Sequence, residues 1–367
     1  MKVNFLDLKA QYESIKNEID SAIAQVINSS SFVLGPSVAK FEQDFARFCH
    51  CDEAVGFNSG TSALFLALKA LGVGPGDEVI TAANTFIATV AAVIYTGATP
   101  VLVDVDQKTR NIEPAKIESV IAAKTRVIIP VHLYGCMVDM DRINQIAKKH
   151  NLIVLEDACQ AHGATFKNRP AGSYGIAGAF SFYPGKNLGA YGEGGAIVTS
   201  DKELARSIRR LRDHGSEKKY YHDVIGFNAR MEGIQGAVLG VKLKYLEEWN
   251  KERNRVASRY RENLKGSPVV SPPEFADFYQ VYHQFVIEVE PRDKLQAYLS
   301  ENGIPTLIHY PIPIHHQKGY LDAGYKAGRF PVTEKLAKTI LSLPIYPELS
   351  NDQIDYISSK IREFFGG

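Results

Sequence analysis

The sequence predicts an α/β fold, and two patterns support this prediction. Apolar runs of strand length alternate along the chain with segments of helical periodicity, and no internal repeat or low-complexity segment interrupts them. The runs are nearly continuous in Val, Ile and Leu, which is typical of parallel strands that are buried on both faces of a sheet. A chain of 367 residues with 45% hydrophobic content can bury a large core, so we expect two domains.

The first half of the chain should form the sheet and its helices. Two amphipathic helices are expected first, because apolar residues recur at steps of three and four over 15–27 and again over 38–48, after Pro36. A loop of small residues then enters a third helix at NSGTSALFLALKALG (58–72). The strand-like runs beyond it are VLVDV (101–105), RVIIPVHLYG (126–135) and NLIVLEDA (151–158), with the helical DMDRINQIAKKH (139–150) between the last two.

The pattern changes from Glu232 onward, where one long helix over 232–264 can carry the chain into a second domain. A Pro-rich segment, SPVVSPPEF (267–275), follows it. The segments HQFVIEVE (283–290), RDKLQAYLSENG (292–303) and PTLIHY (305–310) should then form a strand, a helix and a second strand. We therefore divide the chain into a large domain over 1–245 and a smaller α+β domain over 246–367.

Charge and composition exclude several classes of protein. A net charge of +1 and a pI near 7.7 give no basic field for a nucleic-acid backbone, so we expect no nucleic-acid partner. The N-terminus lacks the apolar stretch of a signal peptide, and no run approaches the roughly 18 apolar residues of a membrane span. We expect a cytoplasmic protein that has no membrane partner.

The four cysteines, Cys49, Cys51, Cys136 and Cys159, are expected to be buried free thiols. Cys49 and Cys51 flank His50, but a second ligand pair at a recognised spacing is missing, so no metal site is predicted.

Three segments carry candidate chemistry. The loop at 59–62 opens a helix whose backbone N–H groups could hold a phosphate dianion, although taken alone it fits a plain N-cap with no ligand better. Asp157 ends an apolar strand, where ligands sit in open α/β sheets, although it could also cap the next turn. Lys186 follows a further strand-like run and precedes a glycine-rich stretch, and a buried lysine is usable as an amine nucleophile. Pyridoxal phosphate needs a phosphate cradle, a carboxylate and a lysine.

Four motifs together resemble one family. They are SFYPGKNLGAYGEGGAIVT (181–199), EDACQAHGA (156–164), NSGTSAL (58–64) and GFNARM (226–231). In the order in which they occur along the chain, they are similar to the DegT/DnrJ/EryC1/StrS family of sugar-nucleotide aminotransferases. Members of this family share the fold-type I architecture of aspartate aminotransferase. The resemblance runs over nearly the whole chain, and it implies that pyridoxal 5'-phosphate is the cofactor.

The resemblance also implies roles for single residues. Lys186 should form the Schiff base with the cofactor, and Asp157 should pair with the pyridine nitrogen. The phosphate should sit on the backbone amides of Thr61 and Ser62 and on the hydroxyl of Ser181. Asn228 should reach the phosphate from a second subunit, which implies a homodimer with shared active sites.

The remaining site residues are weaker expectations. Phe86 falls where the family places an aromatic ring over the cofactor, although plain core packing is an open alternative. Gln160 falls where the family contacts the 3' oxygen of the cofactor. Tyr183, His309 and Tyr310 should line the sugar pocket, and Arg230 should meet the diphosphate. For His309 a structural role or a solvated loop is equally open, as it is for His315 and His316.

The lead-in to the lysine, SFYPGKNLGA, most resembles the branch that aminates C3 of a nucleotide-linked 3-keto-6-deoxyhexose. We therefore expect an aminotransferase that uses L-glutamate as donor and a dTDP-3-keto-6-deoxyhexose as acceptor. A UDP-linked 3-keto-N-acetylhexuronic acid or a 4-keto sugar is the alternative substrate. A regulatory protein that binds the cofactor or a nucleotide sugar without turnover is the alternative from another class, whereas Lys186 argues against a dehydratase.

Overall fold

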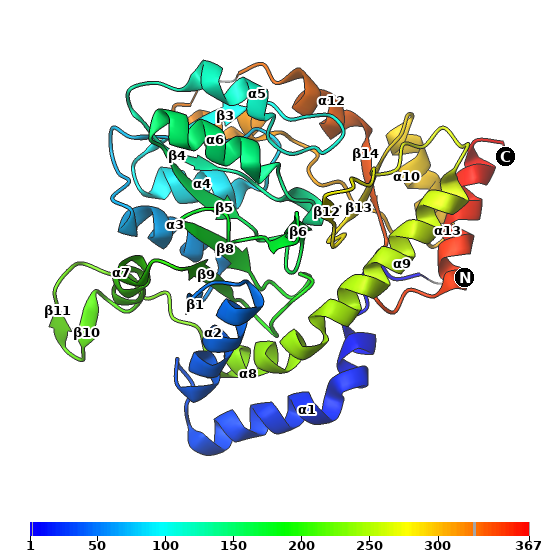
Figure 1. The fold of residues 1–367 in the computed structure, drawn as a ribbon. Helices are drawn as coiled ribbons and strands as arrows, with labels where there is room; N and C mark the ends of the chain where they lie inside the picture. The colour runs from blue at the N-terminus through cyan, green and yellow to red at the C-terminus, as the bar shows by residue number, and fades with distance from the viewer. Residues whose placement is uncertain (2, 326–327, 367) are drawn as a thin grey trace.

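A computed structural model describes residues 1, 3–325 and 328–366 and has the predicted α/β architecture (Figure 1). Its centre is a seven-stranded sheet. In spatial order the strands are β1 (Glu53–Phe57), β9 (Gly195–Thr199), β8 (Ala177–Ser181), β5 (Ile153–Asp157), β4 (Thr125–Ile129), β2 (Glu78–Ala82) and β3 (Thr99–Val103). The strands from β8 to β3 run parallel, and β9 is antiparallel to both of its neighbours. The predicted large and mostly parallel sheet is therefore present.

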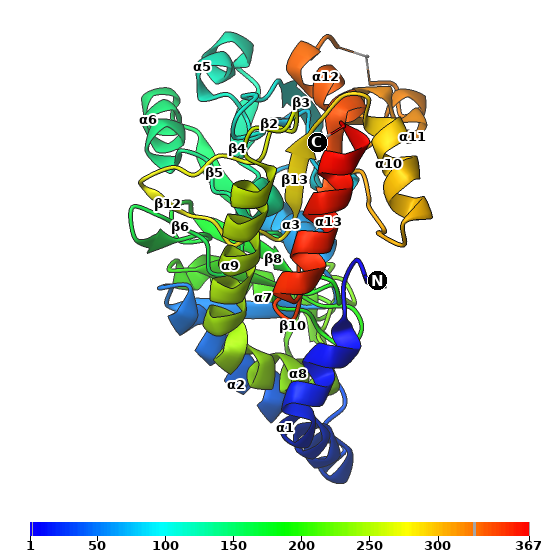
Figure 2. The ribbon, with the colours of Figure 1, turned by 90° about the vertical axis from the view of Figure 1, so that its right-hand side faces the viewer.

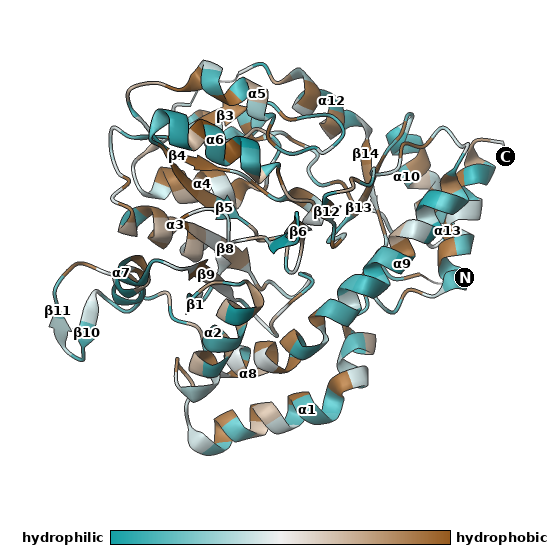
Figure 3. Ribbon diagram, viewed as in Figure 1, coloured by the Kyte–Doolittle hydropathy of each residue, from teal (hydrophilic) through white to brown (hydrophobic). Residues whose placement is uncertain are grey.

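Helices cover both faces of this sheet. One face packs on α3 (Gly60–Ala70), α4 (Ile87–Tyr95) and α7 (Lys202–Arg212), and the other packs on α2 (Pro36–Phe48), α6 (Met140–His150) and α8 (Gly233–Lys242). In Figure 3 the central strands are mainly brown, whereas α6 carries long teal stretches. The remaining helices before α8 are α1 (Leu8–Ser29) and α5 (Pro114–Ile117), which leads into a 3₁₀ turn at Glu118–Val120; a second 3₁₀ turn lies at Leu133–Gly135.

Strand alternation decides which side chains reach the α3 and α4 face. In β5, Val154 belongs to the core on the α2 and α6 side and Leu155 to the core on the α3 and α4 side. Side chains two residues apart share a face, so Asp157 lies on the α3 and α4 side, and Glu156 lies on the opposite side. The same rule places Ser181 of β8 beside Asp157, because Ala179 is the register partner of Asp157.

The long helix expected over 232–264 consists of α8, a 3₁₀ turn at Leu243–Tyr245 and α9 (Leu246–Leu264). It carries the chain to a second core, which contains Val3 and buried residues between Val256 and Ile361. Figure 2 shows α9 beside α13 (Asn351–Phe364) in this part of the molecule. Its other elements are β13 (Phe285–Glu288), α10 (Arg292–Glu301), a 3₁₀ turn at Ile314–His316, α11 (Lys318–Asp322), α12 (Pro331–Thr339), β14 (Ile340–Leu343) and α13 (Asn351–Phe364).

The second strand of the smaller sheet is not where the sequence predicted it. β13 pairs with β14, and the predicted strand at 305–310 contributes only a bridge between Leu307 and Ser342. Prolines at 305, 311 and 313 lack the N–H group that a continuous ladder needs, so this segment pairs at one point and then leaves the sheet.

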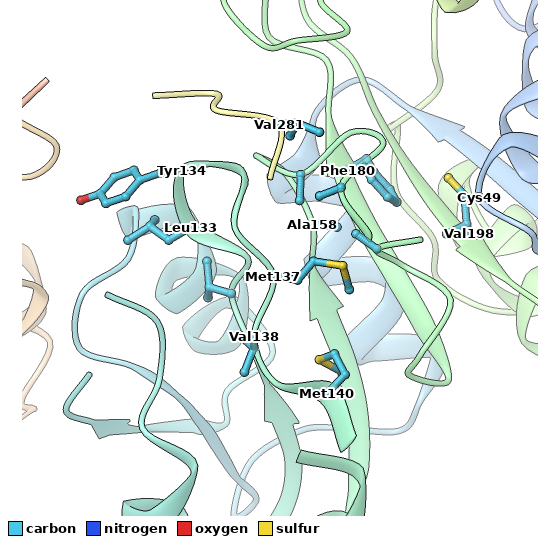
Figure 4. Close-up of a cluster of buried hydrophobic side chains, with 14 of the residues drawn as sticks. Cys49, Leu133, Tyr134, Met137, Val138, Met140, Ala158, Phe180, Val198 and Val281 are labelled. Carbon is cyan, nitrogen blue, oxygen red and sulfur yellow. The ribbon is translucent and has the colours of Figure 1, made fainter. Parts of the chain in front are cut away.

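Short strands join the two halves of the chain. β12 (Phe278–Tyr279) pairs with β6 (Thr165–Phe166), which in turn pairs with β7 (Arg169–Pro170). Figure 4 shows Val281, which follows β12, in the same buried cluster as Ala158 and Phe180. A separate hairpin of β10 (Ser216–Lys218) and β11 (Tyr221–His222) extends from the end of α7 (Figure 1). Among the described residues, no helix combines the length and the apolar character needed to cross a membrane.

Candidate active site

The candidate site is a cavity of about 560 Å³ at the carboxyl ends of β5 and β8. The turns that follow β1 and β2 complete its walls, so it lies where ligands bind in open α/β sheets. Nine of the twelve site residues predicted from the sequence line this cavity: Thr61, Phe86, Asp157, Gln160, Ser181, Tyr183, Lys186, His309 and Tyr310.

Asp157 is a buried carboxylate with two fixed hydrogen bonds. The hydroxyl of Thr89, on α4, donates to Oδ2 at 2.7 Å, and the backbone N–H of Cys159 donates to Oδ1 at 3.2 Å. The Thr89 hydroxyl in turn lies 2.8 Å from that of Thr85. Together these contacts hold the carboxylate in one orientation at the cavity wall.

Lys186 follows β8 in a tight turn, and its side chain lines the same cavity as Asp157. Its backbone N–H donates to the carbonyl of Tyr183 at 2.8 Å, which closes the turn. Burial lowers the pKa of Lys186, and the nearby Cys159 and Asp157 oppose that shift. A lowered pKa increases the fraction of neutral amine, which is the nucleophilic form.

The small-residue loop at the start of α3 forms the floor of the cavity. Ser59 caps the helix: its Oγ accepts the backbone N–H of Ser62 at 3.1 Å. Gly60 packs against β8 so closely that an added Cβ would lie 2.7 Å from the Cβ of Ser181. Thr61 lines the cavity, whereas Ser62 is outside its lining and its amide is already bonded to Ser59.

Phe86, Tyr310 and Gln160 form a connected group in the lining of the cavity. Phe86 is 51% exposed, so the alternative of plain core packing is wrong for this residue. Its ring centroid lies 5.6 Å from that of Tyr310. The side chain of Gln160 donates to the Tyr310 hydroxyl at 3.1 Å and accepts the backbone N–H of Tyr134 at 2.7 Å. These contacts give the wall a fixed shape.

Tyr183 and His309 are the two remaining predicted residues of the lining. Tyr183 is 56% exposed. His309 is half-buried, and its Nδ1 lies 2.8 Å from the Ser342 hydroxyl. Burial, assisted by the charge of Lys186, lowers the pKa of His309 to about 4, so its ring is neutral near pH 7.

Asn228 and Arg230 do not line this cavity. Arg230 pairs with Asp213 at 2.9 Å, and its Nε donates to Oδ1 of Asn228 at 3.2 Å. Asn228 is exposed and lies between α8 and the protruding hairpin. Their predicted contacts with the cofactor phosphate and the substrate diphosphate stay predictions.

Sequence reasoning missed several groups at the site. Thr89 was not singled out, although it orients Asp157. His283 and Gln284 line the cavity from the segment before β13. Burial holds the pKa of His283 well below its usual range. Their position in the chain gave no signal, because contacts with segments distant in the sequence bring them to the site: β12 pairs with β6, and the backbone N–H of Val281 donates to Gly135.

A second group of titratable side chains lies away from the cavity. The ligand atoms of His315, His316 and Glu334 lie within 4.8 Å of one another. The sequence gave no hint of a carboxylate here, because α12 brings Glu334 to the histidines from a distance along the chain. The Glu334 oxygen that contacts His315 at 3.2 Å also accepts the backbone N–H of Phe330, so this carboxylate already has a partner at the start of α12.

Known proteins match this chain over nearly its whole length. "Pleiotropic regulatory protein" from Geobacillus stearothermophilus is 48% identical, and the match covers 100% of this chain and 99% of that protein. "dTDP-3-amino-3,4,6-trideoxy-alpha-D-glucose transaminase" from Streptomyces venezuelae is 45% identical, with 99% and 96% covered. The crystal structure of S. venezuelae DesV in complex with a ketimine intermediate matches with a TM-score of 0.97 at 45% identity, covering 99% of this chain and 98% of that chain.

The crystal structure of a DegT DnrJ EryC1 StrS aminotransferase from Brucella abortus also matches, with a TM-score of 0.96 at 40% identity, covering 100% of both chains. This similarity confirms the predicted fold-type I class. A family model agrees with the resemblance that the four motifs suggested. It covers residues 13–362 and describes the DegT/DnrJ/EryC1/StrS aminotransferase family. This chain belongs to that family.

Proposed function

We propose that this chain is a pyridoxal 5'-phosphate-dependent aminotransferase that passes the amino group of L-glutamate to C3 of a nucleotide-linked keto sugar. One observation carries the proposal. Lys186 and Asp157 line one cavity, together with the small-residue loop that opens α3. A lysine with a lowered pKa, an oriented carboxylate and a helix N-terminus form the set of groups that this cofactor requires.

The residues fit the cofactor on chemical grounds. The close packing of Gly60 on Ser181 leaves the backbone at the start of α3 open to the cavity, where a phosphate would be held. The Phe86 ring supplies an apolar face and Gln160 supplies a polar contact. When bound, the cofactor supplies an electron sink for the pair of electrons released at the substrate carbon.

The protein's own groups would then handle charge and protons. Asp157, held by Thr89 and by the N–H of Cys159, keeps a negative charge in place at the cavity wall. The amine of Lys186 would accept the proton from Cα of the amino donor and return it later in the cycle.

The acceptor that we propose is a dTDP-3-keto-6-deoxyhexose. The resemblance of SFYPGKNLGA to the C3-aminating branch supports this choice, and so does the name of the S. venezuelae transaminase. A UDP-linked 3-keto sugar is the alternative, and a 4-keto sugar is the less favoured one.

We further propose a homodimer with shared active sites. The described basic residues of the cavity are Lys186, His283 and His309, and burial lowers the pKa of all three. An anionic nucleotide sugar therefore needs cations from outside this lining. Arg230, on a segment beside the exposed hairpin, could supply one to a partner subunit. The division into domains near residue 245 and the cytoplasmic location also stay proposals.

The test is optical. The purified chain is loaded with pyridoxal 5'-phosphate, treated with L-glutamate and then given nucleotide keto sugars one at a time. We expect the absorbance band of the lysine-bound cofactor to vanish with glutamate and to return with a dTDP-3-keto-6-deoxyhexose. The Lys186→Ala variant is the control, and it should never develop the band.

Other outcomes would redirect the proposal. Return of the band with a UDP-linked 3-keto sugar alone would overturn the dTDP assignment, and return with only a 4-keto sugar would overturn the regiochemistry. A band that glutamate never alters would exclude the aminotransferase and support a regulatory protein that binds the cofactor without turnover.

A further inference from the structure

Lys242, at the end of α8, is a lysine in the interior of the protein. Its side chain is 0% exposed. Its Nζ donates to the backbone carbonyl of Gly189 at 2.8 Å and lies 4.3 Å from the centroid of the Tyr191 ring. Burying an ammonium group costs several kcal/mol unless nearby groups stabilise it, so a lysine at this position requires an explanation. Both groups in contact with its Nζ belong to the loop that carries Lys186.

The loop between β8 and β9 is held to the helices by several side chains. On α8, Gln235 accepts the backbone N–H of Tyr191 at 2.9 Å. The side chain of Asn187 donates to Asn250 of α9 and to the Val281 carbonyl, both at 2.9 Å. With the bond from Lys242 to Gly189, these contacts fix the loop at successive points after Lys186.

The loop is packed so closely on itself that Gly189 cannot move independently of its neighbours. A Cβ added at Gly189 would lie 2.3 Å from the Pro184 carbonyl oxygen, so the two ends of this turn are in close contact. The backbone N–H of Lys186 donates to Tyr183 inside the same turn, and Ala190 donates to Phe182 at 2.8 Å. A shift at Gly189 must therefore move the backbone from which the Lys186 side chain extends.

We propose that Lys242 is a positioning residue for Lys186: by donating to the Gly189 carbonyl it holds the loop over 186–191 against α8, so that the Lys186 amine stays directed into the cavity. This inference rests on the proposed function, because it assigns Lys186 the role of binding the cofactor. A lysine that only filled space between α8 and the sheet would leave the loop unaffected when replaced by a side chain of similar volume.

The first experiment replaces Lys242 by methionine, which keeps much of the volume and removes the charged donor. We expect the cofactor-free chain to stay folded, since apolar groups often replace buried charges without loss of stability. Hydrogen–deuterium exchange of the peptide covering 183–192 should rise, and that of the α3 peptide should not. The dissociation constant for pyridoxal 5'-phosphate should rise by roughly ten- to hundredfold, the range that a charged hydrogen bond predicts.

Lys244→Met is the matched control. Lys244 lies two residues further on, its side chain is 62% exposed, and it pairs with Glu18 at 2.8 Å. An exposed ion pair contributes little to stability. The hydrogen–deuterium exchange and the cofactor affinity of Lys244→Met should therefore match those of the unaltered chain. Equal exchange and equal affinity in Lys242→Met would overturn the proposal, and so would a rise in exchange spread evenly over all peptides. If the unaltered chain fails to capture the cofactor, the proposed function fails, whereas the exchange of the cofactor-free loop still tests Lys242.

A second measurement needs no variant at Lys242. Burial lowers the pKa of Lys242 to about 7, against the opposing charge of Glu348. The other titratable group in contact is Tyr191, whose pKa burial raises to about 12, so it stays neutral. Above the pKa of Lys242 the ammonium becomes a neutral amine and its bond to Gly189 weakens. Exchange of the 183–192 peptide, corrected for the intrinsic effect of pH, should therefore rise between pH 6 and 8 relative to the α3 peptide.

The Glu348→Gln variant shows whether Lys242 or Glu348 causes the rise in exchange with pH. Without the Glu348 charge the pKa of Lys242 should fall, so the midpoint should move to lower pH. A change that disappears in this variant would assign the effect to Glu348, and a flat profile in the unaltered chain would show that Lys242 does not control the loop. Either result would overturn the proposal, even if Lys242→Met does not fold.

Discussion

Replacing Glu156 by glutamine should destabilise the fold, whereas replacing its neighbour Asp157 by asparagine should remove the chemistry and leave the fold intact. Glu156 is fully buried on the side of the sheet away from the cavity. Its Oε1 accepts the backbone N–H groups of Tyr174 and Gly175, both at 2.7 Å. Its Oε2 accepts the N–H of Gly172 at 2.8 Å and lies 2.9 Å from Nε2 of His132.

The tautomer of this histidine follows from its other nitrogen. Nδ1 of His132 accepts the backbone N–H of Val138 at 3.2 Å, so in the neutral ring the proton lies on Nε2 and is donated to Glu156. The carboxylate thus accepts four hydrogen bonds. A glutamine offers one oxygen, and its amide would face two of the four donors with its own N–H groups. Each unsatisfied buried donor costs about 1–3 kcal/mol, so the expected loss is about 2–6 kcal/mol.

Asp157→Asn differs because both of its partners can adapt. The amide oxygen can keep the N–H of Cys159, and the amide N–H₂ can donate to Thr89, whose hydroxyl can turn toward Thr85. The expected loss of stability is below about 1 kcal/mol. Removing the buried charge from the cavity wall should slow the half-reaction with L-glutamate by roughly 10²- to 10⁴-fold, which corresponds to about 3–5 kcal/mol.

Urea unfolding of the two cofactor-free variants measures their losses of stability. Single-turnover absorbance with L-glutamate measures the rate of the half-reaction. At 25 °C a loss of 2–6 kcal/mol would be a large share of the roughly 5–15 kcal/mol by which domains are stable. Equal losses of stability in the two variants would refute the argument from strand alternation. A normal rate in Asp157→Asn would refute the role of the charge.

Two further predictions concern the cavity wall and the pH dependence of stability. Phe86→Ala removes the ring whose centroid lies 5.6 Å from that of Tyr310. The dissociation constant for the cofactor should therefore rise about two- to tenfold in a fluorescence titration. The dissociation constant of Phe86→Tyr should stay close to that of the unaltered chain. Burial lowers the pKa of His162 to about 3, and its Nε2 lies 2.9 Å from the Ser181 carbonyl. The unfolded chain, with a histidine pKa of about 6.5, binds a proton that the native chain does not, so the free energy of unfolding should fall as pH drops from about 6.5 toward 3. Urea unfolding at a series of pH values checks this, and an unchanged slope in His162→Gln would contradict it.

The sequence predicted the layers of the large sheet because their signals are local. Val, Ile and Leu runs mark strands that are buried on both faces, and alternation within each run decides which end residue faces the cavity. Asp157 was found in this way from β5, whereas Ser181 came from the family resemblance. The smaller sheet was mispredicted, because β13 pairs with β14 from much further along the chain and not with the segment that follows α10. Pairing between distant segments leaves no mark in either segment alone.

The same limit explains which site residues were missed. The predicted residues mostly lie in motifs with small residues or at strand ends. His283, Gln284 and Thr89 have neither signal: two reach the cavity through the pairing of β12 with β6, and Thr89 faces Asp157 from the first turn of α4. Lys242 was missed for another reason, since a lysine in an amphipathic helix is expected at the surface.

The buried polar groups near Lys186 share one electrostatic property. Burial lowers the pKa of His162, His283 and His309, so three histidines near the loop or in the cavity are neutral near pH 7. A permanent cation in any of these positions would repel a protonated Lys186 and also attract the phosphate away from the helix N-terminus. Neutral histidine rings can form part of the cavity surroundings without competing for either group. The cavity of one chain thus keeps Asp157 as its oriented buried charge, and the cations that an anionic sugar nucleotide needs must come from outside the lining.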